Sequence, residues 1–159
     1  GYEKTFAEME EIGIRGQELK AAFLADVDRD TEAFNSVMDA MRLPKKTDED
    51  KAQRTAAIEE ATKQATLVPL GVLERTKEAA KLARRVVEKG NVNSTSDAGV
   101  AALAARAAAE GAFLNVRINL PGIEDESFKK ETLDKALELR NEVVNHTEKT
   151  VKLAEKSMD

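Results

Sequence analysis

Apolar residues recur at three- and four-residue steps along most of the chain, a pattern that predicts long amphipathic helices. The first run holds no proline and predicts one helix over about 2–43. Pro44 ends this helix because its ring disfavours helical geometry at Leu43. Gly16 falls on the apolar stripe, where its missing side chain either admits another backbone or simply weakens the helix. The stripe consists of Phe6, Met9, Ile12, Leu19, Phe23, Val27, Phe34 and Met41.

Capping and stop signals predict a second helix between Thr47 and Gly90. Thr47 is followed at once by three acidic residues, which suit an N-cap and a first helical turn, and glycine commonly follows a last turn. Pro69 interrupts the middle of this segment and removes one backbone donor. The carbonyl thereby freed near Ala65 needs another partner, and the side chain of Thr66 is a candidate.

The polar segment 90–99 precedes a third predicted helix, over about 100–120. Ser94 and Asp97 have the spacing of a capping box, although Ser96 is an alternative cap. The helix is alanine-rich and apolar nearly all round, which is typical of a central, buried helix.

After a Pro-Gly pair, Asp125 is predicted to cap a last helix that runs to about Met158. Four long helices with short connections predict an all-α fold, an antiparallel bundle of about four long helices. No run of strand length alternates between apolar and polar residues. At 159 residues the chain fits one domain, 1–159.

Composition narrows the possible partners and surroundings. The net charge of -5 argues against nucleic-acid binding, which depends on a basic surface. Cysteine is absent, and no leader or run long enough to span a membrane is visible, so we expect no membrane partner and a cytoplasmic location.

The most informative residue is Asp30, within the stretch LADVDRDTEAFNSVMDAMRLPK. It lies on the apolar stripe together with Phe34, whereas Asp26 flanks the stripe and Asp28 points about 200° away from Asp30. A carboxylate in a core position must be paired, protonated or used in chemistry. The structural alternative to a catalytic Asp30 is a buried ion pair with an arginine from another helix.

Polar residues within the alanine-rich helix are the second unexpected feature. Asn115 and Asn119 lie one turn apart, where they could bond a planar heterocycle or tie helix ends together. Arg106 and Glu110 have the spacing of an intrahelical ion pair.

A group of basic residues surrounds the first predicted turn: Arg42, Lys45, Lys46 and Arg54. They could form a basic mouth for an anionic ligand tail, or serve solubility alone. The one histidine, His146, lies among charged neighbours and is expected on the solvated surface. No metal-binding spacing is present, so we expect no metal site.

Three ordered segments carry a family resemblance: DVDRDTEAFNSVMDAMRLPK, RTAAIEEATKQATLVPL and GNVNSTSDAGVAALAARAAAEGAFLNVRINL. Together they resemble the cyclodeaminase/cyclohydrolase family, which includes the C-terminal domain of formiminotransferase-cyclodeaminase and bacterial methenyltetrahydrofolate cyclohydrolases. The resemblance implies an all-α enzyme whose acting acid is Asp30. Family members usually begin with a further helix after a Pro-Gly-Gly-Gly-Ser-like turn. This chain starts beyond that point, so we expect a domain truncated at its N-terminus.

The resemblance further implies a folate substrate, no cofactor and a homodimer. The expected reaction is closure of 5-formiminotetrahydrofolate to 5,10-methenyltetrahydrofolate with loss of ammonia, with Asp30 moving the proton. The alternatives are hydrolysis of methenyltetrahydrofolate to 10-formyltetrahydrofolate, or a non-enzymatic helical assembly module. The expected substrate-binding residues are Arg42, Lys45 and Arg54 for the glutamate tail and Asn115 and Asn119 for the pterin edge.

Overall fold

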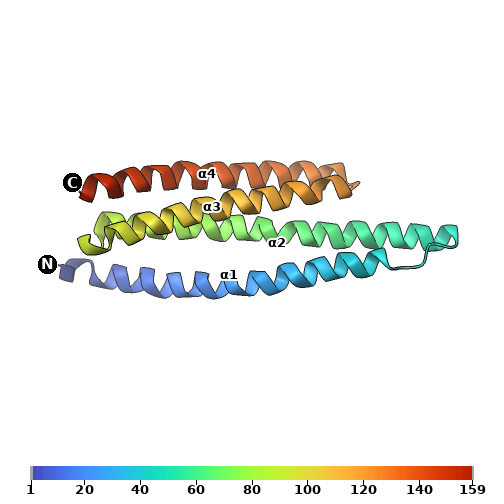
Figure 1. Cartoon of the computed structure of the whole chain (residues 1–159), viewed down its shortest axis with the longest axis horizontal. Coiled ribbons are helices and arrows are strands. Elements are labelled where there is room, and N and C mark those ends of the chain that lie inside the picture. The colour runs from blue at the N-terminus through green and yellow to red at the C-terminus, as the bar shows by residue number, and fades with distance from the viewer. Residues whose placement is uncertain (1, 159) are drawn as a thin grey trace.

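The computed structural model describes residues 2–158, and these form an all-α, antiparallel arrangement of four long helices (Figure 1). Successive helices run in opposite directions along one axis, as the sequence predicts. Short 3-10 turns precede α1 and flank α3. The long helices are α1 (Phe6–Met41), α2 (Asp48–Lys89), α3 (Thr95–Asn119) and α4 (Glu126–Met158).

Two of the predicted helix caps are present. The hydroxyl of Thr47 accepts a hydrogen bond from the Asp50 N–H at 3.0 Å, and the Asp50 carboxylate accepts from the Thr47 N–H at 3.1 Å. At the start of α4, the Asp125 carboxylate accepts a hydrogen bond from the Phe128 N–H at 3.0 Å. These three bonds satisfy amide groups that have no partner within the helix at its N-terminus.

The capping box predicted at Ser94 is wrong. The Ser94 side chain makes no capping bond, and α3 already begins at Thr95. A 3-10 turn over Val92–Ser94 leads into the helix, and the Asn91 side chain accepts a hydrogen bond from the Asn93 N–H at 2.9 Å. The turn thus supplies the local hydrogen bonding that the sequence assigned to Ser94.

The central helix is α2, not the alanine-rich α3. Helix α2 packs against α1, α3 and α4, whereas α3 packs mainly on α2 and α4. The prediction of a fully buried α3 is therefore wrong for this chain. Its alanines let α2 and α4 approach closely along one face, while the opposite face is exposed. The large apolar residues on that open face are Val100, Leu103, Leu114 and Ile118.

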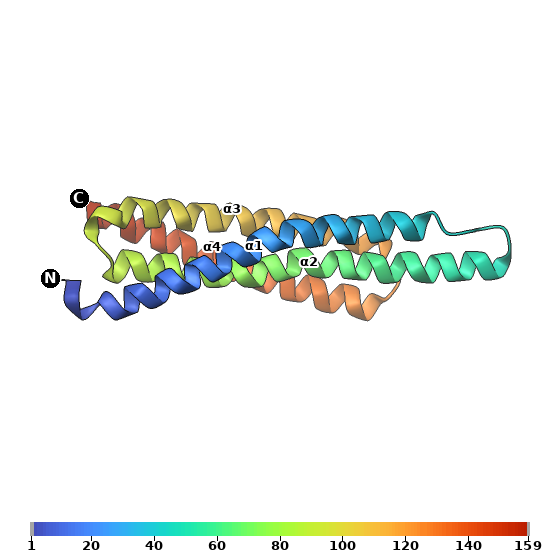
Figure 2. The same cartoon turned by 90° about the horizontal axis from the view of Figure 1, so that it is seen from below.

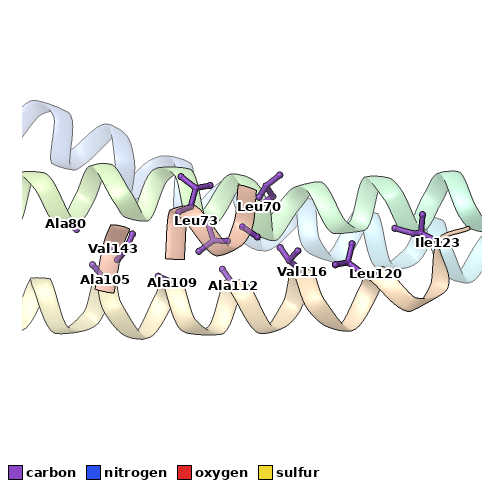
Figure 3. Close-up of a cluster of buried hydrophobic side chains, with 12 residues drawn as sticks. Leu70, Leu73, Ala80, Ala105, Ala109, Ala112, Val116, Leu120, Ile123 and Val143 are labelled. Carbon is purple, nitrogen blue, oxygen red and sulfur yellow. The ribbon is translucent and has the colours of Figure 1, made fainter. Parts of the chain in front are cut away.

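The core lies where α2, α3 and α4 meet (Figure 3). Leu73 of α2, Val116 of α3 and Val143 of α4 are fully shielded from solvent, and alanines of all three helices fill the space between them. Replacing such a leucine by alanine typically costs about 2–5 kcal/mol of stability. Helix α1 packs on the outside of this three-helix core, mainly against α2.

The carbonyl freed by Pro69 is satisfied from α3. The side-chain amide of Asn119 donates to the Ala65 carbonyl oxygen at 3.3 Å. Thr66 was predicted for this role, and that prediction is wrong, because its hydroxyl donates instead to the Thr62 carbonyl at 2.7 Å. The bond from Asn119 joins the end of α3 to the middle of α2.

Glu110 also bonds across helices. Its carboxylate accepts two hydrogen bonds from the Arg140 guanidinium of α4, at 2.8 and 2.9 Å, so the predicted pairing with Arg106 is wrong. Arg140 and Arg117 both lie over the ring of Phe113, at 5.6 and 5.8 Å from its centroid. Side chains of α3 and α4 therefore form a partly exposed polar and aromatic contact beside the core.

No helix within residues 2–158 combines the length and the apolar character needed to cross a membrane.

Candidate active site

A cavity of about 410 Å³ lies between α1 and α3, with α2 forming part of its wall. The walls are mainly apolar, and a few polar side chains reach them from α1 and α3. A volume of this order is typical of small-molecule sites. The lining residues are Phe23, Asp26, Val27, Asp30, Thr31, Val68, Pro69, Val72, Ala108, Ala112 and Asn115.

The buried acid of this site is Asp26, which is 4% exposed. Arg75 of α2 donates from Nε at 2.7 Å and lies with Nη2 at 2.6 Å from the same carboxylate oxygen, Oδ2. Arg29 donates to the other oxygen, Oδ1, at 2.8 Å. Both carboxylate oxygens are therefore occupied, which satisfies a buried charge that would otherwise be costly.

Asp30 itself is exposed, so its predicted position in the core is wrong. The interhelical ion pair considered for Asp30 exists one turn earlier, at Asp26. The stripe drawn through Val27 and Phe34 is an exposed apolar edge of α1, because these side chains are 63% and 62% exposed. Asp30 shares that edge, at the rim of the cavity.

A seven-residue repeat along α1 marks the face that is really buried. Ile12, Leu19, Asp26 and Ala40 are all less than 10% exposed, and Ala33 is half-buried. A repeat of seven is the signature of helices that pack side by side with a small crossing angle. Asp26 is the polar member of this repeat, which the sequence alone does not distinguish from the competing stripe through Val27 and Phe34.

Gly71 provides the space in which Arg75 reaches Asp26. A Cβ atom at Gly71 would lie 2.9 Å from Nη2 of Arg75. The two residues are one turn apart on α2, so the missing side chain leaves room for the guanidinium to fold back over the helix. Sequence reasoning overlooked both Gly71 and Arg75, because neither has a distinctive local pattern.

Asp30 and Asn115 are brought together on the walls of one cavity, from α1 and α3 respectively. Both side chains are exposed, and neither forms a hydrogen bond or ion pair with another residue in the range 2–158. A carboxylate can transfer a proton or stand beside a cation, and a carboxamide can bond the edge of a heterocycle. The site thus offers two free polar groups on an apolar surface.

The other predicted binding residues lie elsewhere. Asn119 is outside the lining of this cavity and bonds Ala65. Arg42 pairs with Asp39 at 2.9 Å, and Arg54 donates to a backbone carbonyl at 3.1 Å. Together with the exposed Lys45, they occupy the end of the α1–α2 hairpin, which projects beyond α3 and α4 (Figure 2). Their role toward a ligand stays a prediction.

A second cavity, of about 680 Å³, lies between the first half of α1, the second half of α2 and the start of α3. It shares the Phe23 wall with the first cavity and is lined mainly by apolar side chains. Gly16 faces this space, and no atom of another segment lies within 4 Å of the place where its Cβ would be. The close backbone contact considered for Gly16 is therefore absent within residues 2–158.

Metal-binding clusters are absent from the described part of the chain, where no three His, Cys, Asp or Glu residues are grouped to hold an ion. The site therefore offers one unpaired carboxylate and one amide, set among apolar groups.

Comparison with known proteins identifies the class to which this fold and site belong. The formiminotransferase-cyclodeaminase family model matches residues 1–138, and the chain belongs to this family. This confirms the resemblance seen in the sequence.

Individual relatives agree with that assignment. The methenyltetrahydrofolate cyclohydrolase of Methylorubrum extorquens is 44% identical over 132 residues, which are 83% of this chain and 64% of that protein. The formimidoyltransferase-cyclodeaminase of Gallus gallus is 36% identical over 84% of this chain and 25% of its own length. The chain thus spans less than two thirds of either relative.

A solved structure supports the same fold. The crystal structure of formiminotetrahydrofolate cyclodeaminase from Thermotoga maritima superposes with a TM-score of 0.86 and 29% identity. The match covers all of this chain and 75% of that one.

Proposed function

We propose that this chain acts on a one-carbon derivative of tetrahydrofolate, at the electrophilic carbon carried by the N5 nitrogen. The observation that carries the proposal is that Asp30 and Asn115 line the same cavity, each without a hydrogen-bond or ion-pair partner among residues 2–158, in a chain of this family. Asp26 is neutralised by two arginines, which leaves Asp30 as the carboxylate available to a ligand.

Hydrolysis of 5,10-methenyltetrahydrofolate is the reaction we place first, because the 44% identical relative bears the name of that activity. Asp30 takes a proton from water as the oxygen bonds to the amidinium carbon. The bond from that carbon to the N5 nitrogen then breaks with its electron pair on N5, and Asp30 returns the proton to N5. The added hydroxyl loses its own proton to solvent as the formyl C=O bond forms. The product is 10-formyltetrahydrofolate with net release of one proton, and the ionised Asp30 stabilises the cationic substrate carbon.

Cyclodeamination is the second candidate, because the relative of known structure is named a cyclodeaminase. Here the N10 nitrogen of 5-formiminotetrahydrofolate bonds to the carbon of the protonated formimino group, the electron pair of the C=N double bond moves to the formimino nitrogen, and Asp30 accepts the N10 proton. Asp30 then donates it to the departing nitrogen, which leaves as ammonia as 5,10-methenyltetrahydrofolate forms. One acid serves both reactions because each moves one proton between two nearby atoms.

The remaining sequence predictions are proposals for substrate binding. Asn115, which lines the cavity, is proposed to bond the pterin edge, and Asn119 is proposed for the same role in addition to its bond to Ala65. Arg42, Lys45 and Arg54 are proposed to attract the glutamate tail by charge. The chemistry uses side chains alone, and we propose no cofactor.

A two-substrate assay tests the proposal. The ultraviolet band of methenyltetrahydrofolate should decay if the chain hydrolyses it and grow if the chain closes 5-formiminotetrahydrofolate. A helical assembly module would change neither substrate and would show no saturable binding of a reduced folate. If the chain changes neither substrate, or binds no reduced folate saturably, the enzymatic proposal is excluded.

We further propose that two copies associate through the open face of α3. Its exposed positions recur at three- and four-residue steps, and an uncharged stripe of this length is characteristic of an interaction surface. Isologous dimers are the commonest oligomers, so a second copy is the proposed occupant. The stripe consists of Val100, Leu103, Ala107, Gly111, Leu114 and Ile118.

The organisation of residues 1–159 as one domain and its cytoplasmic location stay predictions from the sequence.

A further inference from the structure

Two ion pairs of opposite orientation join α2 to α4. Glu74 of α2 pairs with Lys135 of α4, and Lys77 of α2 pairs with Glu142 of α4. Each cation on one helix thus faces a carboxylate on the other. Pairing of opposite charges across neighbouring helices is the usual arrangement, because like charges repel.

This pairing of opposite charges stops at the next turn, around a cavity of about 350 Å³. Lys81 and Arg84 of α2 line it from one side and Lys149 of α4 from the other, while the paired Lys77 and Glu142 line its edge. Arg84 pairs with Glu88 of its own helix at 2.7 Å. Within residues 2–158, Lys81 and Lys149 form no ion pair or hydrogen bond with a carboxylate, although Glu78 and Glu148 lie near enough to interact with them electrostatically. Cationic charge therefore gathers here from both helices.

His146 lines the same cavity from α4 and is half-buried, so its predicted place on the solvated surface is wrong. Its Nε2 atom is buried and has no hydrogen-bond partner within the described chain. Burial lowers the pKa of His146, the nearby Arg84, Lys81 and Lys149 lower it further, and Glu88 acts in the opposite direction. The ring is therefore mainly neutral at neutral pH, although an anion beside it would favour its protonation.

We propose that this pocket binds a compact oxyanion that carries two or more negative charges, through Lys81, Arg84, His146 and Lys149. The Lys77–Glu142 ion pair forms its edge. Such a ligand supplies the negative charge that the α2–α4 contact lacks at this turn, and its oxygens can accept hydrogen bonds from lysine, arginine and histidine. The site is distinct from the Asp30 cavity, with which it shares no lining residue. The inference goes beyond the proposed folate chemistry and does not depend on it.

The single histidine of the chain makes the test direct. Its ring signals are followed by nuclear magnetic resonance while inorganic phosphate, diphosphate or citrate is added at constant ionic strength maintained with chloride. A saturable shift at one site and a rise in the pKa of His146 with bound anion are expected. Diphosphate and citrate both carry several negative charges, so comparing their affinities shows whether the site prefers phosphate or carboxylate oxygens.

Matched double variants separate a site from general attraction. Replacing Lys81 and Lys149 by glutamine (Lys81→Gln, Lys149→Gln) should weaken anion binding about tenfold or more. The control pair Lys51→Gln and Lys152→Gln removes the same net charge from the same two helices, at lysines paired with Asp48 and Glu148. It should bind as the parent does. Three outcomes would overturn the proposal. The His146 signals could shift equally with chloride alone, the shift could fail to saturate, or binding could weaken equally in both double variants.

Discussion

Arg75 of α2 holds Asp26 of α1 through two nitrogens that lie 2.7 and 2.6 Å from the same carboxylate oxygen. Helix α1 packs mainly on α2, so this ion pair is a polar contact within the surface that attaches α1 to the rest of the fold. The same ion pair determines which carboxylate of the candidate site is available to a ligand. Asp26 is neutralised, and Asp30 remains free on the same cavity.

Removing the arginine should destabilise the chain. Arg75→Met leaves a buried carboxylate with Arg29 as its remaining partner, and we expect a loss of about 2–3 kcal/mol of unfolding free energy. The double variant Asp26→Leu with Arg75→Met should lose less than the sum of the two single variants, since no unpaired charge remains. Urea unfolding of the four proteins measures this coupling. Asp39→Asn, which breaks the exposed pair with Arg42, should cost less than about 0.5 kcal/mol, and an equal cost at both sites would contradict the structure.

Asp30→Asn should abolish most activity without affecting folding. Loss of the proton-transferring group is expected to reduce kcat by about 100-fold or more. The side chain is exposed and unpaired, so the unfolding free energy should stay within about 0.5 kcal/mol of the parent value. Asp28→Asn, an exposed acid two residues earlier on the same helix, is the control and should keep normal turnover. Normal turnover in Asp30→Asn itself would exclude the catalytic role.

The bond between Asn119 and the Ala65 carbonyl can be isolated by a double-mutant cycle. Asn119→Ala should cost about 1 kcal/mol because it leaves the Ala65 carbonyl unpaired beside Pro69. In a Pro69→Ala background, residue 69 supplies its own N–H to that carbonyl, and the same substitution should then cost markedly less. Thermal or urea unfolding measures all four proteins. Equal costs in the two backgrounds would show that Asn119 contributes by packing alone.

Charge on the open face of α3 should prevent self-association. Leu114 is 61% exposed, and Leu114→Glu would place a carboxylate within the proposed dimer contact. We expect light scattering to show a dimer for the parent and a monomer for this variant. Met158→Glu, at an exposed position at the end of α4, should remain dimeric. A monomeric parent would contradict the proposal.

His146 should make stability depend on pH. The pKa of His146 in the folded chain is lowered, chiefly by burial, so a proton binds the unfolded chain more strongly. The contribution of His146 to stability is therefore complete above about pH 6.5 and is lost as the pH falls toward the lower pKa of the folded state. In buffers without multivalent anions, the urea midpoint of the parent should fall more between pH 7.5 and 5.5 than that of His146→Gln. Equal decreases of the urea midpoint in the two proteins would show that folding does not lower the pKa of His146.

The sequence by itself determined the four helices and their direction. Apolar steps of three and four residues, Pro44, Gly90 and the caps at Thr47 and Asp125 are local signals, because a backbone hydrogen bond or a restricted dihedral angle acts over a few residues. The family was likewise visible in the order of three segments. These features need no knowledge of which helix faces which.

Only the tertiary structure decided which polar residues are buried and which are free. Asp26 and Asp30 are one turn apart on α1, and the sequence favoured Asp30 as the acid in the core. The choice between them depends on the rotation of α1 about its axis in its packing on α2, which turns Asp26 toward Arg75, about fifty residues further along the chain. The same holds for Asn119 with Ala65, and for Lys81 with Lys149. Partners on separate helices meet through packing, which local periodicity does not encode.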